Sequence, residues 1–205
     1  MDSRREFLKK AAFLSGGAAM LNTLPPVIQK ALAINPAVGS TFYDAEHVVF
    51  LMQENRSFDH ALGTLQGVRG FNDPRAITQP NKNKVWLQSN KEGLTYAPFH
   101  LNIKETKIAW MGSTPHNWTD QTDARNGGKY DSWLDVKKPY KTTYAHMPLT
   151  MGYCKREDFP FYHSLADAFT VCDQNFCSVI AGTHPNRYYW MTGTIRTENS
   201  PEGLA

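Results

Sequence analysis

The run Val48-Val49-Phe50-Leu51-Met52 constrains the fold of this chain more than any other stretch. Large and β-branched apolar residues without polar alternation are typical of a short strand that is buried on both faces, as in a parallel sheet. Polar residues follow at once, and Ser57, three residues before His60, suits the N-terminus of a helix. Strand, polar turn and helix in this order predict an α/β fold that binds its ligands at the carboxyl end of the strand.

Glu54 and Asn55 follow this predicted strand directly. They offer a carboxylate and an amide oxygen side by side, and hard oxygen ligands of this kind suit a divalent cation. The alternative is an ordinary solvated turn, because a Glu-Asn pair after a strand carries no metal by itself.

The first residues have the pattern of an export signal. Ser3-Arg4-Arg5-Glu6-Phe7-Leu8-Lys9-Lys10 is followed by a mildly apolar stretch, and Ala31-Leu32-Ala33 offers a small-x-small cleavage site. We therefore predict a twin-arginine signal peptide over residues 1–33, and a bacterial protein that is periplasmic or secreted through the twin-arginine machinery. The alternatives are a basic amphipathic helix or a membrane anchor, although the apolar stretch is short and rich in glycine for a membrane span.

About 170 residues remain after this leader, enough for one domain. The net charge is only +3 and no basic tract is present, which argues against a nucleic-acid partner. Three cysteines occur, at Cys154, Cys172 and Cys177. Cys172 and Cys177 are close enough to pair, but spacing does not fix connectivity, and free, buried thiols are expected in a chain that folds before export.

The remaining segments are predicted from turn residues and periodicity. Residues 61–115 are dense in Gly and Pro and are expected to form a connecting excursion. Apolar spacing predicts a helix from Phe161 to Phe169. The other predictions are a short strand at Val85-Trp86-Leu87, an extended segment from Thr95 to His100, a turn at Asn126-Gly127-Gly128 and a strand at Thr170-Val171-Cys172-Asp173.

Two further positions carry functional chemistry. His116 follows a proline at an expected helix entry, where imidazole can bind a phosphate oxygen or carry a proton, or can simply sit at a surface cap. Gly182, Thr183 and Pro185 predict a tight turn into a helix with Thr183 at its N-cap. A helix N-terminus attracts phosphate, and a metal-held hydroxyl there is a nucleophile, although Thr183 could serve only as the cap.

Three motifs, taken together, resemble a known family. They are Gln53-Glu54-Asn55-Arg56-Ser57-Phe58-Asp59, then His116-Asn117-Trp118 with Asn126-Gly127-Gly128, and then Thr183-His184-Pro185-Asn186-Arg187 followed by Met191-Thr192-Gly193-Thr194. This series resembles the bacterial phosphoesterase family of phosphocholine-preferring, non-hemolytic-type phospholipases C and related acid phosphatases. The segment from Met151 to Tyr162 and the threonine at 183 look like the phospholipase C branch.

The resemblance implies an alkaline-phosphatase-like α/β core, with a mostly parallel sheet flanked by helices. It also implies one divalent metal ion of unknown identity, bound by Glu54, Asn55 and Thr183. Thr183 is then the nucleophile and forms a phospho-threonyl intermediate, and His116 contacts the phosphoryl oxygens. Asn186 and Arg187 are expected to orient the turn or the phosphate.

The implied reaction cleaves a phosphatidylcholine-type lipid to diacylglycerol and phosphocholine, which requires transient contact with a membrane lipid surface. An acid-phosphatase-type phosphomonoesterase and an inactive exported binding module are the alternatives. In the family, further metal ligands come from a downstream acidic pair, and no Asp-Asp pair occurs in this chain. We therefore expect residues 34–205 to be the N-terminal part of the catalytic domain, with an incomplete sheet and no activity on their own.

Overall fold

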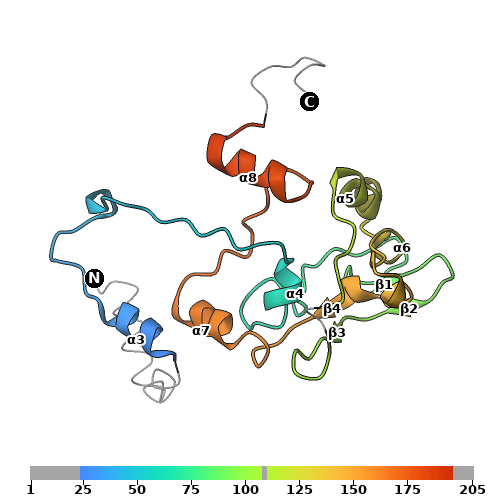
Figure 1. Cartoon of the computed structure of the whole chain (residues 1–205), viewed down its shortest axis with the longest axis horizontal. Coiled ribbons are helices and arrows are strands. Elements are labelled where there is room, and N and C mark those ends of the chain that lie inside the picture. Colours follow the sequence, from blue (N-terminus) through green and yellow to red (C-terminus); the bar gives the residue numbers. More distant parts are fainter. Residues whose placement is uncertain (1–23, 108–109, 196–205) are drawn as a thin grey trace. The chain divides into compact units, whose positions relative to one another are not determined.

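The structure is a computed structural model that describes residues 24–107 and 110–195. The chain divides into two compact units, which are treated separately. The first contains residues up to Met52 together with Pro160–Val171, and the second contains Gln53–Phe159 together with the residues from Cys172 onward. Figure 1 labels the elements along the chain.

The first unit is built on two helices that contact one another, α3 (Pro26–Ala33) and α7 (Pro160–Ala168). Each contributes one buried side chain, Ile28 from α3 and His163 from α7. A short 3-10 helix, η1 (Phe42–Asp44), lies between them in sequence. Helix α7 confirms the helix predicted from Phe161 onward. The predicted leader ends where α3 ends, and its arginine pair lies outside the described residues.

The predicted strand at Val48–Met52 is wrong for this structure. No strand is assigned there, and Val48, Val49 and Leu51 are 55%, 90% and 79% exposed. A strand buried on both faces needs neighbouring strands at its edges and layers above and below. The described strands pair only with each other, so this apolar run has no sheet to enter.

The second unit contains four short strands in two separate pairs. Strand β1 (Gln88–Ser89) is antiparallel to β2 (Thr95–Tyr96), and β3 (Phe99–His100) is parallel to β4 (Gly152–Tyr153). Mixed helices and strands agree with the α/β class, but the mostly parallel sheet is not found in residues 24–107 and 110–195. The extended segment at Thr95–His100 is confirmed. The predicted strands at Val85–Leu87 and Thr170–Asp173 are wrong, because neither segment finds a partner strand there.

The core of the second unit lies beside the parallel pair. Leu101, Met111 and Cys154 are buried together, and four side chains pack against them: Phe99, Tyr144, Leu149 and Phe159. Gly152 of β4 must be glycine, because a Cβ there would overlap the Leu101 side chain. The Gly152 backbone of β4 thus packs closely against the side chain of Leu101, which follows β3 directly.

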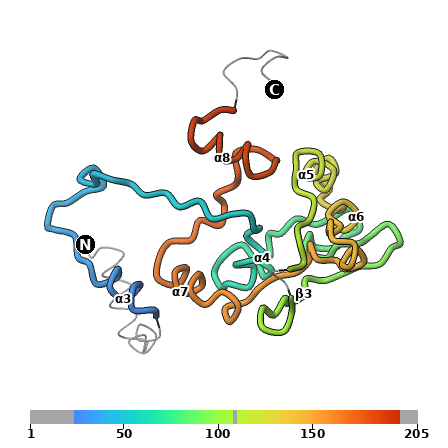
Figure 2. Tube along the Cα trace, in the orientation of Figure 1, coloured from blue at the N-terminus to red at the C-terminus, as the bar shows by residue number. Residues whose placement is uncertain are grey.

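The helices of the second unit are α4 (Phe58–Leu62), α5 (Trp118–Arg125), α6 (Trp133–Val136) and α8 (Thr183–Thr192), with 3-10 turns η3 (Asn126–Gly128), η4 (Thr142–Tyr144) and η5 (Leu149–Met151). Helices α5 and α6 lie side by side (Figure 2). Asn126, in the left-handed region at φ 46°, ends α5 and confirms the predicted turn. The helices of the described ranges are all too short or too polar to cross a membrane.

The three cysteines are free thiols. Cys154 is buried, whereas Cys172 and Cys177 are exposed and unpaired with each other. The free thiols agree with the expectation, but the expected burial is found only for Cys154 and is wrong for Cys172 and Cys177.

Candidate active site

The segment Glu54–Asn55 is held by the helix that follows it. Ser57 caps α4, since its hydroxyl accepts the N–H of His60 at 3.2 Å, as the sequence predicted. His60 then fixes α4 to β4: its Nδ1 donates to the Gly152 carbonyl at 2.8 Å, and its own carbonyl accepts the N–H of Cys154 at 2.8 Å. Burial lowers the pKa of His60, and the hydrogen bond to the Gly152 carbonyl opposes this shift only in part.

His116 stands just before α5. Asn117 is the N-cap, and its side chain and that of Asp120 form a capping box at 3.0 Å in each direction. His116 Nδ1 donates to the Thr114 carbonyl at 2.7 Å, so its Nε2 carries a free lone pair in the neutral ring. The buried Lys137 donates to the Pro115 carbonyl at 2.8 Å and to Gln121 at 2.6 Å, which locks the backbone before His116.

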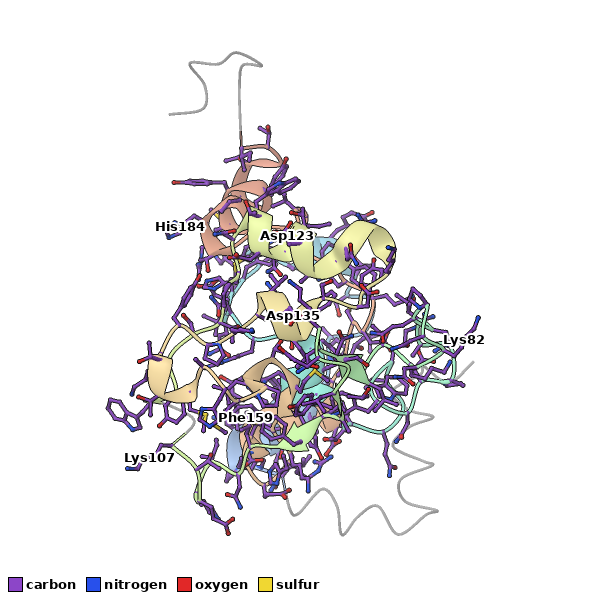
Figure 3. The ribbon with its side chains drawn as sticks, turned by 90° about the vertical axis from the view of Figure 1, so that its right-hand side faces the viewer. Lys82, Lys107, Asp123, Asp135, Phe159 and His184 are labelled. Carbon is purple, nitrogen blue, oxygen red and sulfur yellow. The ribbon has the colours of Figure 1, made fainter. Side chains whose placement is uncertain are left out.

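The sequence predicted Thr183 as the N-cap of a helix. In the structure Thr183 is the first residue of α8, one position further into the helix. The N-cap is Gly182, which offers no side chain, so the N–H groups of Thr183 and His184 receive no side-chain cap. Pro185 lies in the first turn, where its missing N–H costs nothing. The helix therefore begins with exposed positive ends of N–H groups next to a hydroxyl. Figure 3 labels His184 on α8 and Asp123 on α5.

Asn55 joins these two segments. Its Nδ2 lies 3.4 Å from Thr183 Oγ1 and 3.5 Å from His116 Nε2, so one amide faces both the hydroxyl and the imidazole. The unprotonated Nε2 accepts from this amide, in agreement with Nδ1 donating to Thr114. Residues far apart in sequence are thus brought together as the sequence analysis required.

Glu54 meets Arg187 from the second turn of α8. Arg187 Nη2 lies 3.4 Å from Glu54 Oε1, and both side chains are partly exposed. An exposed pair of this kind contributes little to stability, about 0–1 kcal/mol. Its consequence is electrostatic, because the guanidinium places a positive charge against the carboxylate that was predicted to bind metal.

Asn186 does not face the others. Its amide makes four hydrogen bonds, all to the backbone of residues 179–182. Contacts therefore join Asn55, His116 and Thr183 in one group and Glu54 and Arg187 in a separate pair, and Asn186 supports the loop that leads to Thr183.

The donor set fits a divalent cation in chemistry but is small. Glu54, Asn55 and Thr183 supply a carboxylate, an amide oxygen and a hydroxyl, all hard oxygen donors. A half-turn of the Asn55 amide exchanges its nitrogen and oxygen, so this side chain can present either to the hydroxyl. Within the described ranges no three His, Cys, Asp or Glu side chains group as a metal site. Glu54 is the one anionic residue among the three predicted ligands.

Sequence reasoning missed the residues that hold this site in place. They are His60 and Lys137, together with the approach of Gly182 to His116. Of these, only Gly182 had a signal in the sequence, as a glycine before a predicted helix start.

A hydroxyl at a helix N-terminus, an imidazole and oxygen donors are groups that can contact a phosphate-like anion in an α/β protein. The family comparison agrees: residues 45–204 match the model of the Phosphoesterase family, and this chain belongs to that family. The resemblance seen in the motifs is thereby confirmed.

Related proteins cover nearly all of this chain. Non-hemolytic phospholipase C of Burkholderia pseudomallei is 45% identical over 98% of this chain and 28% of its own length. Hemolytic phospholipase C of Pseudomonas aeruginosa is 42% identical over 93% of this chain and 25% of its own length. Phospholipase C B of Mycobacterium tuberculosis is 37% identical, over 98% and 39%. The chain thus spans between about a quarter and two fifths of the length of these relatives.

Proposed function

We propose that this chain carries the nucleophile-bearing part of a phosphodiester hydrolase, a phospholipase C acting on phosphatidylcholine-type lipids. The carrying observation is the Asn55 amide, which lies 3.4 Å from the Thr183 hydroxyl and 3.5 Å from His116 at the uncapped start of α8. The names of the relatives support the reaction class. For the whole domain the proposal includes an alkaline-phosphatase-like core with a mostly parallel sheet, on the ground of the motif resemblance and membership of the family.

In the first half of the reaction, Thr183 Oγ1 attacks phosphorus and loses its proton to water. The P–O bond to diacylglycerol breaks, and the leaving oxygen takes a proton from water. The product on the enzyme is a phospho-threonyl diester that still carries choline. N–H groups at the start of α8 donate to the phosphoryl oxygens, where negative charge develops, and His116 contacts the same oxygens.

In the second half, water attacks the same phosphorus. The P–O bond to Thr183 breaks, the hydroxyl regains a proton, and phosphocholine leaves. A divalent cation held by Glu54, Asn55 and Thr183 would favour deprotonation of the hydroxyl and supply positive charge beside the phosphate. Arg187 adds charge from the next turn of α8.

The place of action is part of the proposal. The arginine pair and cleavage pattern of residues 1–33 support export by the twin-arginine pathway to the periplasm or beyond. A lipid substrate then requires the protein to approach a membrane surface transiently.

The test is a chimera in which residues 45–204 of this chain replace the matching region of the Burkholderia relative. We expect it to hydrolyse p-nitrophenyl phosphocholine faster than p-nitrophenyl phosphate. The reverse preference would favour a phosphomonoesterase. Substrate binding without turnover of either ester would favour a binding module.

A further inference from the structure

The side chain of Asn186 sits where a phosphate ligand was expected, yet all its hydrogen bonds go to the protein backbone. Nδ2 donates to the carbonyls of Val179, Ala181 and Gly182 at 3.1, 3.1 and 3.0 Å, and Oδ1 accepts the N–H of Val179 at 3.2 Å. The orientation of the amide is fixed by this network, because the reverse would set oxygen against three carbonyls.

The loop that Asn186 organises lies against His116. A Cβ on Gly182 would stand 3.3 Å from the His116 carbonyl oxygen and 3.8 Å from His116 Cδ2. Gly182 has an ordinary negative φ of −75°, so a larger residue would be opposed by this tight contact and not by the backbone conformation. Figure 2 shows the same loop running directly into α8.

We infer that Asn186 is a positioning residue, whose amide donor shapes residues 179–182 so that Gly182 meets His116 and Thr183 enters α8 facing Asn55. The consequence for catalysis rests on the proposed function, whereas the positioning itself does not. Asn186 lies about one helical turn after Thr183 in α8. The positioning role requires no contact between Asn186 and the substrate.

A simple helix-stabilising role predicts something different. A carboxylate near a helix N-terminus is favourable, so Asn186→Asp would be neutral or stabilising if Asn186 only supported α8. If Asn186 instead holds residues 179–182 in place, Asn186→Asp is harmful, because it replaces the amide donor with an anion beside three carbonyl oxygens. The sign of the Asp effect therefore separates the two roles.

Asn102 provides a matched control. Its Oδ1 accepts the N–H groups of Lys104 and Glu105 at 2.9 and 3.3 Å, so the used group is the acceptor. Asn102→Asp keeps that acceptor and should be silent, although the substitution is the same as at position 186.

The experiment uses the full 205-residue chain and its variants Asn186→Asp, Asn186→Ala and Asn102→Asp. We expect both Asn186 variants to move the His116 Cδ2–H NMR resonance and to speed exchange of the Ala181 amide about tenfold, the effect of losing one net hydrogen bond. Asn102→Asp should leave the His116 resonance and the exchange of the Ala181 amide unchanged. The His146 resonance should not move in any of the variants. An unmoved His116 resonance in Asn186→Asp, or equal effects of the two Asp variants, would overturn the inference.

A second arm adds orthovanadate, a phosphate analogue, and follows the Thr183 amide resonance. We expect binding by the parent chain and about tenfold weaker binding by Asn186→Asp. Equal vanadate affinity in the two proteins would overturn the link between the loop and the site. If the parent chain binds no vanadate, the proposed function loses support, while the resonance and exchange results still decide the positioning role.

Discussion

The Asn55 amide nitrogen lies 3.4 Å from the Thr183 hydroxyl, although 128 positions separate the two residues in the chain. The same nitrogen lies 3.5 Å from His116 Nε2. One side chain thus links the segment after the apolar run 48–52 to the start of α8 and to the entry of α5. Because Asn55 contacts both Thr183 and His116, its substitution is the most informative one after that of Thr183.

Asn55→Ala removes both contacts and one oxygen donor. In the chimera with the Burkholderia relative, we expect kcat to fall about 10²- to 10³-fold, the usual effect of deleting one preorganised polar group in an active site. KM should change less, since the amide acts on the reacting centre. Asn102→Ala, which alters a loop asparagine bonded to the backbone of Lys104 and Glu105, serves as the control. Equal losses in the two variants would contradict the assigned role.

Glu54 and Arg187 should affect cation binding in opposite directions. Glu54→Gln removes the anionic ligand, whereas Arg187→Gln removes a positive charge 3.4 Å from it. We therefore expect Mn²⁺ affinity, measured by EPR on the chain itself, to fall in the first variant and to rise a few-fold in the second. Unchanged affinity in Glu54→Gln would remove Glu54 from the metal ligands.

Asp158 should make stability depend on acid pH. Burial opposes its charge, but the N–H groups of Ile103 and Lys155 and the His100 ring outweigh burial, so its pKa lies below the ordinary value. The contacts measure 2.9, 2.7 and 2.6 Å. A carboxyl with a depressed pKa stabilises the fold above its unfolded value of about 3.9, and this is lost as pH falls through the folded pKa.

We therefore expect Asp158→Ala to lower the free energy of unfolding by about 3 kcal/mol at pH 7, with several charge-assisted hydrogen bonds lost. The difference between parent and variant should shrink below about pH 4. Urea unfolding at several pH values measures it, with the exposed Glu157→Ala as control. A difference that stays constant down to pH 2 would contradict the assignment.

The three thiols should differ in reactivity. Burial raises the pKa of Cys154 to about 11, so at pH 8 only about one molecule in a thousand carries its thiolate. Iodoacetamide should therefore modify Cys172 and Cys177 in the native chain and Cys154 only after denaturation, as read by peptide mass spectrometry. Early modification of Cys154 would show that the core around Leu101 opens readily.

Local signals in the sequence predicted the helix starts well. Ser57 is the N-cap of α4, and Asn117, next to His116, is the N-cap of α5. Thr183 is the first residue of α8, one position from the predicted cap. Helix α7 followed from its apolar spacing because a helix satisfies its own backbone.

Strands were predicted less well, because a strand is completed by residues elsewhere in the chain. Val48–Met52 has the composition of a buried strand, yet the described residues provide no strand that pairs with it. The sequence left two roles open for Asn186, orienting the turn or orienting the phosphate. Only the shape of residues 179–182 decides between them, and the amide bonds the turn.

Capture of the covalent intermediate tests the central claim most directly. The chimera is quenched during turnover of p-nitrophenyl phosphocholine, and the peptide containing Thr183 is analysed by mass spectrometry. We expect a phosphocholine adduct on Thr183, with Thr183→Ala lacking both adduct and turnover and Thr183→Ser retaining part of each. Turnover by Thr183→Ala at a rate near that of the parent, or an adduct on another residue, would contradict the assignment of Thr183 as the nucleophile.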